Sequence, residues 1–209
     1  MVSGLSRATR RMIVGLTGNF GMGKSTVARF FREKGAVVLD SDRIAHEAFQ
    51  KGHPVYPKIR GLFRGVRGTL DRKKVAAVVF RNSKKRRALE SVIHPYVFGR
   101  IEEEAAKSRG PVVIVEVPLL FESGFDRRCD RKIVVECDRE KVFERLGRKG
   151  VRPAEIERRW KAQGPVPEKI GRADYLIDNS KSLAATRRQV SRIWKEFKTL
   201  ALSNRERSL

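Results

Sequence analysis

The chain has 209 residues, of which 40% are hydrophobic, and 47 Lys and Arg against 24 Asp and Glu give a formal net charge of +23. This apolar content excludes an intrinsically disordered chain and is enough for one compact domain with an insert. The basic excess predicts attraction of anions, and it leaves nucleic acid, a small polyphosphate and no specific partner as open interpretations.

Cys129 and Cys137 are too few for a disulfide framework or a metal knuckle. No run approaches the roughly 18 apolar residues that a membrane-spanning helix needs. Residues 1–11 lack the apolar block of a signal peptide, and we interpret them either as a flexible N-terminal extension or as sequence upstream of a start at Met12. We therefore expect a cytoplasmic protein that does not contact a membrane.

Short apolar runs alternate with helical patterns along the chain. Each run is apolar at nearly every residue, which is typical of strands buried on both faces of a parallel sheet. The runs cover residues 12–16, 36–39, 111–117, 132–137 and 175–177, and the helices expected beside them cover 24–34, 139–149 and 182–202. The pattern predicts an α/β fold, a parallel five-stranded sheet with helices on both faces.

The segment between the second and third runs is much longer than an ordinary crossover. Residues 44–109 show only helical patterns, at 71–80, 84–93 and 96–107. A helical insert of this length beside a parallel sheet predicts a second domain.

The first run leads into a glycine-rich loop, Gly18-Asn19-Phe20-Gly21-Met22-Gly23-Lys24-Ser25, which matches G-x-x-x-x-G-K-[ST]. The loop follows an apolar strand and opens an apolar-faced helix, which is the context that the motif requires. Glycines allow the backbone N–H groups to point at phosphate oxygens, and the positive end of the helix adds to the attraction. A chance match is the alternative.

The motif predicts an ATP site of the P-loop NTPase type. Lys24 is expected to reach the β- and γ-phosphates, and Ser25 to hold Mg²⁺ through its hydroxyl. The residues expected to bind ATP in this loop are Gly18, Gly21, Met22, Gly23, Lys24, Ser25 and Thr26.

Further motifs follow this loop in a fixed order. They are Leu39-Asp40-Ser41-Asp42, His94-Pro95, Val117-Pro118-Leu119-Leu120-Phe121-Glu122, Arg159 with Gln163, Lys169, and Ile177-Asp178-Asn179. The ordered set resembles the dephospho-CoA kinase family over nearly all of residues 12–197. The resemblance implies transfer of phosphate from ATP to the ribose 3′-hydroxyl of dephospho-coenzyme A, which gives coenzyme A and ADP in the last step of coenzyme A synthesis.

The resemblance also implies how the chain is divided. It implies a P-loop core of residues 12–44, 110–140 and 172–204, a helical acceptor-binding insert of residues 45–109, and a small helical lid of residues 141–171. Three residues depart from the family pattern: Asn19, Met22 and Glu116 stand where glycine, serine and aspartate are frequent.

Asp42 is our candidate for the general base, because a carboxylate can orient the attacking hydroxyl and accept its proton. The argument assumes that the second strand lies beside the first. The alternative is that Asp42 only caps the helix that starts near Arg43. For Asp40, two interpretations are open: it orders a water on Mg²⁺, or it hydrogen-bonds the phosphate loop.

The acceptor is expected to contact a second group of residues, namely Thr17, Asp42, Arg72, Phe80 and His94. Arg72 has a simpler interpretation as part of a solvated helix face beside Lys73 and Lys74. His94 precedes Pro95, and its simpler interpretation is a residue at a helix boundary.

A basic cluster after the fourth run, Arg145, Arg148, Lys149 and Arg152, is predicted to belong to the lid. Arginines that close over a transferring phosphoryl group stabilise its charge, although a charge run is also typical of a solvated face. We select Arg148, together with Arg159, as the residues that contact phosphate, and the resemblance adds Asn179 to the ATP site. The predicted catalytic set is Asp42, Lys24 and Arg148.

Three other functions compete with this prediction. Another small-molecule P-loop kinase, of nucleoside or shikimate type, shares the loop. A GTPase would carry an Asn-Lys-x-Asp motif, which the sequence lacks. A nucleic-acid-dependent ATPase is suggested only by the charge of +23. We expect ATP and dephospho-CoA as partners and no obligatory nucleic acid, and we leave the oligomeric state open.

Overall fold

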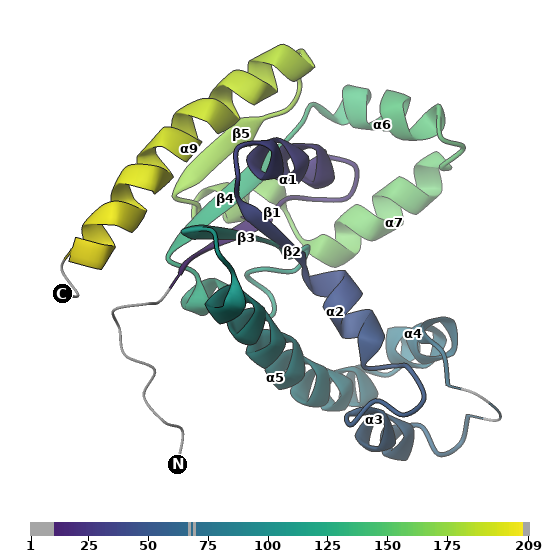
Figure 1. Cartoon of the computed structure of the whole chain (residues 1–209). Helices are drawn as coiled ribbons and strands as arrows, with labels where there is room; N and C mark the ends of the chain where they lie inside the picture. The colour runs from purple at the N-terminus through teal and green to yellow at the C-terminus, as the bar shows by residue number, and fades with distance from the viewer. Residues whose placement is uncertain (1–10, 67, 69, 207–209) are drawn as a thin grey trace. The chain divides into compact units, whose positions relative to one another are not determined.

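Figure 1 shows the computed structural model of the chain, which describes residues 11–66, 68 and 70–206. Within the helices, the side chains at 72, 73, 81 and 204–206 are not described. The chain forms two compact units: a core unit, up to Leu39 and from Ala105 onward, and an insert unit, Asp40–Glu104. The predicted N-terminal extension lies outside the described residues except for Arg11, whose Nε donates to the Ser108 carbonyl at 3.0 Å.

The described residues contain one five-stranded sheet in the order β2-β3-β1-β4-β5. The strands are β1 Met12–Thr17, β2 Val37–Asp40, β3 Val112–Glu116, β4 Arg131–Glu136 and β5 Tyr175–Asp178. β1 runs parallel to both β3 and β4, so that Leu16 lies between Glu116 and Ile133, and β4 runs parallel to β5. The predicted parallel five-stranded sheet is confirmed.

The expectation that the second strand lies beside the first is wrong, because β3 separates β2 from β1. The burial of the strands explains this order. All residues of β1 are buried, as in a central strand, whereas β2 is only partly buried and ends on the exposed Asp40. A strand of mixed burial suits the edge of a parallel sheet, where one side has no neighbouring strand.

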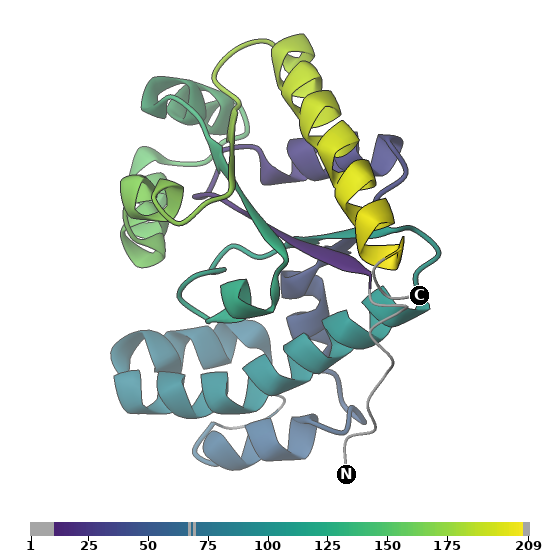
Figure 2. The same cartoon turned by 90° about the vertical axis from the view of Figure 1, so that its left-hand side faces the viewer.

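One face of the sheet is covered by α1 Lys24–Glu33 and α9 Leu183–Glu206, which lie next to each other in Figures 1 and 2. Their apolar sides join alternate residues of the strands in one cluster. Phe31 of α1 stacks on Phe197 of α9 with ring centroids 6.1 Å apart and meets the edge of Trp194 at 6.5 Å. This packing fixes α1 and therefore the loop that precedes it.

On the other face, Gly15 of β1 lies against Cys129 and Leu120, and an added Cβ would come within 2.9 Å of both. The short 3-10 helix Phe125–Arg128 directly precedes Cys129 in the chain, and it contacts β1. Burial raises the pKa of the Cys129 thiol to about 12, with Asp130 and Asp126 adding to the effect, so Cys129 is an inert packing residue. The remaining helices of the core unit are α6 Arg139–Gly147, α7 Pro153–Gln163 and α8 Val166–Ile170.

The insert unit is helical, as predicted. Its helices are α2 Ser41–Glu47, α3 Tyr56–Leu62, α4 Arg72–Arg81 and α5 Ser83–Lys107, and α5 continues into the core unit. They enclose a separate apolar cluster around Ile59, Phe63 and Leu70. Among the described residues, no helix combines the length and the apolar character that crossing a membrane requires.

The two helices predicted at 84–93 and 96–107 are one helix, α5, with Pro95 inside it. Proline within a helix removes one hydrogen bond and costs about 3 kcal/mol. Leu89 and Ile93 before Pro95, and Tyr96 after it, all pack on the same apolar cluster. This shared packing offsets the cost of the proline, and a sequence pattern that treats each side of Pro95 separately does not reveal it.

Phe197→Ala tests the contact between α9 and α1. Phe197 is fully buried, and it packs on Tyr175 as well as on Phe31. We expect a loss of about 3–5 kcal/mol in the free energy of unfolding, measured by chemical denaturation. Leu202→Ala is the control on the same helix, because Leu202 is 58% exposed, and it should change stability by about 0.5 kcal/mol or less. Equal effects of the two variants would contradict the described packing.

Candidate active site

The loop between β1 and α1 has backbone conformations that require glycine. Gly23 has φ +92, and a Cβ there would lie 2.0 Å from Asn179 Nδ2. Gly18 has φ +147, and a Cβ there would lie 2.3 Å from the Val135 carbonyl oxygen. Both approaches are shorter than any real Cβ contact, so another residue at either position would displace the loop.

The positive end of α1 lies at this loop. Gly23 is the N-cap and provides no side-chain cap, and its carbonyl accepts from the N–H groups of Thr26 at 3.0 Å and Val27 at 3.1 Å. Lys24 Nζ donates to the carbonyls of Gly18 at 2.7 Å and Asn19 at 3.3 Å. The ammonium therefore lies at the mouth of the loop, beside the helix end that attracts anions.

Asn179 holds the loop from the side of β5. It is 2% exposed, its Nδ2 donates to the Met22 carbonyl at 2.9 Å, and its Oδ1 accepts from the Thr186 hydroxyl at 3.0 Å. Both ends of the amide are thus satisfied by hydrogen bonds. The described contacts of Asn179 fix the backbone of the loop, and its predicted contact with ATP stays a prediction.

The other side of the loop is tied to the end of α7. Both backbone groups of Phe20 are used: its N–H donates to Gln163 Oε1 at 2.7 Å, and its carbonyl accepts from Trp160 Nε1 at 2.7 Å. Asn19 Nδ2 donates to the Gly164 carbonyl at 3.0 Å. The Arg159 guanidinium lies 4.1 Å from the centroid of the Phe20 ring. The segment predicted as the lid is therefore linked directly to the phosphate loop.

These contacts add residues that the sequence reasoning did not place in the site. Trp160 and Gln163 are three positions apart and so share one face of α7. That spacing indicates in the sequence that the two side chains can share a partner. It does not indicate that this partner is Phe20, 140 positions before Trp160. A backbone partner leaves no trace in the pattern of side chains.

The predicted lid arginines lie in different surroundings. Arg145 Nη1 donates to the Asn179 carbonyl at 3.0 Å and lies 3.4 Å from Cys137 Sγ. Burial raises the pKa of Cys137, and the nearby Arg145 opposes this shift. The side chain of Arg148 is 76% exposed, and its Nη2 contacts Glu144 Oε1 at 2.5 Å. Arg145 thus supports the loop through Asn179, whereas Arg148 extends into solvent.

Asp40 is the N-cap of α2. Its Oδ1 accepts hydrogen bonds from the backbone N–H groups of Asp42 at 2.9 Å and Arg43 at 3.2 Å. The alternative that Asp42 is only the cap of this helix is therefore wrong, because Asp40 performs that function. Asp42 lies in the first turn of α2 with an exposed side chain.

The other predicted acceptor contacts are divided between the two units. Thr17, in the core unit, is fully buried, and its hydroxyl donates to the Pro118 carbonyl at 3.3 Å. Arg72, Phe80 and His94 belong to the insert unit, together with Asp42. Phe80 is 79% exposed, and Arg72 begins α4 with a side chain outside the described residues.

His94 lies inside α5, so the interpretation as a residue at a helix boundary is wrong. Its ring stacks on Phe98 with centroids 5.6 Å apart. Burial lowers the pKa of His94, and the charge of Glu90 opposes this shift. His94 is therefore predominantly neutral near pH 7 and suits hydrogen bonding more than charge pairing.

A metal site built only from protein side chains is absent from the described part of the chain, where no three His, Cys, Asp or Glu side chains converge. Mg²⁺ in kinases is held by one or two protein oxygens together with substrate phosphates and waters. A hydroxyl at the start of α1, as Ser25 provides, is the type of donor that such a site needs.

The family model of dephospho-CoA kinase matches residues 12–185. The chain belongs to the dephospho-CoA kinase family. It is 43% identical to the dephospho-CoA kinase of Aquifex aeolicus over 88% of this chain and 96% of that protein.

Solved structures agree with this assignment. The crystal structure of TT1252 from Thermus thermophilus has a TM-score of 0.80 at 36% identity and covers 90% of this chain and 98% of that one. The dephospho-CoA kinase of Campylobacter jejuni has a TM-score of 0.63 at 26% identity, with 88% and 96% covered. The predicted family and P-loop kinase fold are confirmed, and the family excludes the GTPase and shikimate-type alternatives.

Asn179→Asp tests how the loop is held. The carboxylate cannot donate to the Met22 carbonyl, and it adds negative charge beside the phosphate site, so we expect ATP affinity to fall about 10- to 100-fold. Isothermal titration calorimetry measures the change. Gln189→Glu is the control, because Gln189 bonds the backbone of Asp178 and not the loop. It should affect stability without a comparable loss of ATP affinity, and equal losses would contradict the assigned role of Asn179.

Proposed function

We propose that this chain transfers the γ-phosphoryl group of ATP to the ribose 3′-hydroxyl of dephospho-coenzyme A, giving coenzyme A and ADP. The observation that carries the proposal is the glycine-dependent loop at the end of β1, with Lys24 at its mouth, in a chain that matches the dephospho-CoA kinase family over residues 12–185. The loop supports the assignment of the ATP site, and membership of the family supports dephospho-CoA as the acceptor.

Lys24 and the N–H groups at the start of α1 bind the β- and γ-phosphates of ATP in this proposal. When a phosphate oxygen arrives, it replaces the loop carbonyls as the partner of the Lys24 ammonium. Ser25 would hold Mg²⁺, which would supply positive charge beside the β- and γ-phosphates, and Asp40 is the candidate to order a water on the metal. Asp40 Oδ1 already accepts the bonds that cap α2, so this second function would fall to Oδ2.

Asp42 acts as the general base. Its carboxylate accepts the proton of the 3′-hydroxyl as the oxygen forms a bond to the γ-phosphorus, and the bond to the bridging oxygen of ADP breaks. The position of Asp42 directly after β2 supports this, because ligands of α/β sheets bind beyond the carboxyl ends of the strands.

The remaining assignments follow the same reaction. The insert, residues 45–109, binds the acceptor with Arg72, Phe80 and His94, and Thr17 contributes from β1. The lid, residues 141–171, brings Arg148 onto the transferring phosphoryl group, and its high exposure suits a residue that binds only with substrate. We place the enzyme in the cytoplasm, and because its substrates are small molecules we expect ATP turnover that does not depend on nucleic acid.

Asp42→Asn tests the base. The amide keeps the shape of the side chain but cannot accept the proton, so we expect kcat to fall about 10²- to 10⁴-fold while ATP affinity stays unchanged. The assay follows conversion of dephospho-CoA to CoA with Mg²⁺, beside a panel of nucleoside and sugar acceptors. Glu103→Gln, at an exposed ion pair on α5, controls for the loss of one carboxylate. Full activity of Asp42→Asn would exclude Asp42 as the base.

Arg148→Met tests the lid. Removal of a cation that contacts the phosphoryl group only in the transition state should lower kcat about 10²- to 10³-fold with little change in ATP affinity. Steady-state kinetics and calorimetry separate the two effects. Arg188→Met, on the exposed side of α9, controls for the change in net charge. Unchanged kcat in Arg148→Met would assign Arg148 to the solvated surface.

A further inference from the structure

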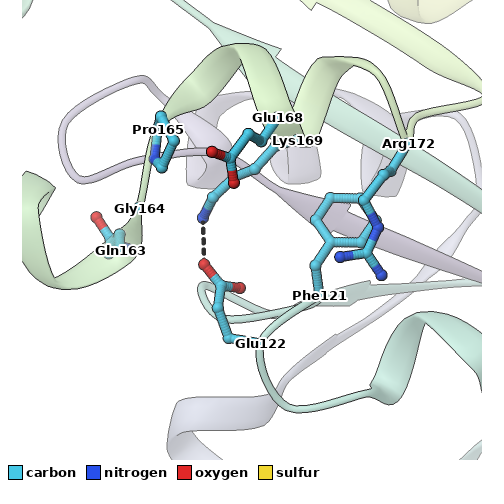
Figure 3. A pocket seen from close by; sticks show the side chains of 8 residues that line it. All are labelled: Phe121, Glu122, Gln163, Gly164, Pro165, Glu168, Lys169 and Arg172. Carbon is cyan, nitrogen blue, oxygen red and sulfur yellow. Dashed lines mark ion pairs between the residues drawn. The ribbon is translucent and has the colours of Figure 1, made fainter.

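A cavity of about 170 Å³ lies in the core unit, between the loop after β3 and the segment that joins α7 to α8. Its volume exceeds by far the roughly 10–15 Å³ that one water molecule needs. Figure 3 shows the side chains of Lys169 and Glu122 pointing toward each other at its wall. None of the residue roles assigned above uses this cavity.

Lys169 is unusual because it is a buried cation with few partners. It is only 4% exposed, and its Nζ lies 3.0 Å from Glu122 Oε1. This ion pair lacks the angles of a hydrogen bond, and within the described part of the chain Nζ has no hydrogen-bond acceptor. An ammonium carries three donors, and burial of a charge is costly unless those donors are satisfied.

The second cation of the wall, Arg172, is already engaged. Its Nη2 donates to Asp126 Oδ2 at 2.8 Å, and its guanidinium lies 4.3 Å from the centroid of the Phe121 ring. Arg172 therefore has a structural explanation, whereas the single ion pair with Glu122 does not account for the donors of Lys169.

The cavity is next to the phosphate loop. Gln163 and Gly164 both line it, and both are bonded to the loop: Gln163 Oε1 accepts from the Phe20 N–H, and the Gly164 carbonyl accepts from Asn19 Nδ2. Two residues that line the cavity are thus hydrogen-bonded directly to the phosphate loop.

We propose that Lys169 binds a phosphate group of a substrate, and that the phosphate replaces Glu122 as its partner. The proposal rests on the proposed kinase function. Two sources have the required chemistry: the diphosphate of dephospho-CoA and the γ-phosphate of ATP. The side chain of Glu122 is 37% exposed, so it can turn to solvent when the anion enters, while Lys169 stays buried and loses little conformational freedom.

The experiment compares Lys169→Met and Glu122→Gln with the wild type. Lys169→Met keeps the length of the side chain and removes the charge, and it should weaken phosphate binding about 10- to 100-fold. Glu122→Gln removes the competing anion, so it should leave phosphate binding unchanged or tighten it. Lys161→Met, at an exposed position on α7, controls for the loss of one positive charge.

Two measurements on Lys169→Met identify which substrate supplies the phosphate. If the acceptor diphosphate is the ligand, Lys169→Met raises KM for dephospho-CoA and leaves affinity for ATP unchanged. If the γ-phosphate is the ligand, the variant lowers affinity for ATP but not for ADP. Either result supports the proposal.

The proposal is overturned if the ion pair between Lys169 and Glu122 has only a structural role. In that case Lys169→Met and Glu122→Gln lower Tm alike, and neither changes KM, ATP affinity or the ratio of ATP to ADP affinity. If the wild type does not phosphorylate dephospho-CoA, the proposed function fails, but two binding measurements still test Lys169: the affinity for a non-hydrolysable ATP analogue relative to ADP, and the binding of inorganic pyrophosphate in the presence of the saturating analogue. Loss of either one in Lys169→Met but not in Lys161→Met keeps the phosphate site, and no change in both rejects it.

Discussion

The close approach of Gly23 to Asn179 is the constraint on which the phosphate site depends. The loop can turn from β1 into α1 only where two glycines let the backbone press against neighbouring groups, Gly23 against the Asn179 amide and Gly18 against the Val135 carbonyl. These two groups follow β5 and lie in β4. Contacts with β4 and with the residue after β5 therefore fix the conformation of the loop. The packing of α9 on α1 fixes the helix that follows it.

The side of the loop opposite Asn179 is held in a different way. There the bonds run from backbone groups of Phe20 to side chains of α7, and the Asn19 side chain bonds the Gly164 carbonyl. Asn179 and Thr186 are buried, whereas Gln163 and Trp160 are only partly so. Bonds near solvent exchange with water at a smaller cost than buried ones. One side of the loop is thus fixed by buried bonds, and the other by bonds that lie closer to solvent.

The sequence was sufficient for features that depend on local patterns. The phosphate motif, the buried strands and the helical character of the insert all leave a periodic or positional signal, and the structure confirms them. The order of the strands leaves none, because burial shows that β1 is central but does not say which strand is its neighbour. The continuity of α5 through Pro95 depends on packing from both sides of the proline, which a local rule does not contain.

The same distinction applies to the site. Lys24 and Ser25 are predicted from their places in a motif, and the structure gives its glycines Gly18 and Gly23 conformations that require glycine. Asp40 and Asp42 lie in one short segment, and the sequence predicts Asp42 as the general base but leaves two interpretations open for Asp40.

The hydrogen bonds distinguish the roles of Asp40 and Asp42, because Oδ1 of Asp40 accepts from two N–H groups at the start of α2. A carboxylate that caps a helix is held by those bonds and stabilises the helix dipole, which makes it a poor acceptor for a substrate proton. Asp42 lies in the first turn of the same helix with an exposed side chain and is not its cap, so the proposed role of general base falls to Asp42 and not to Asp40.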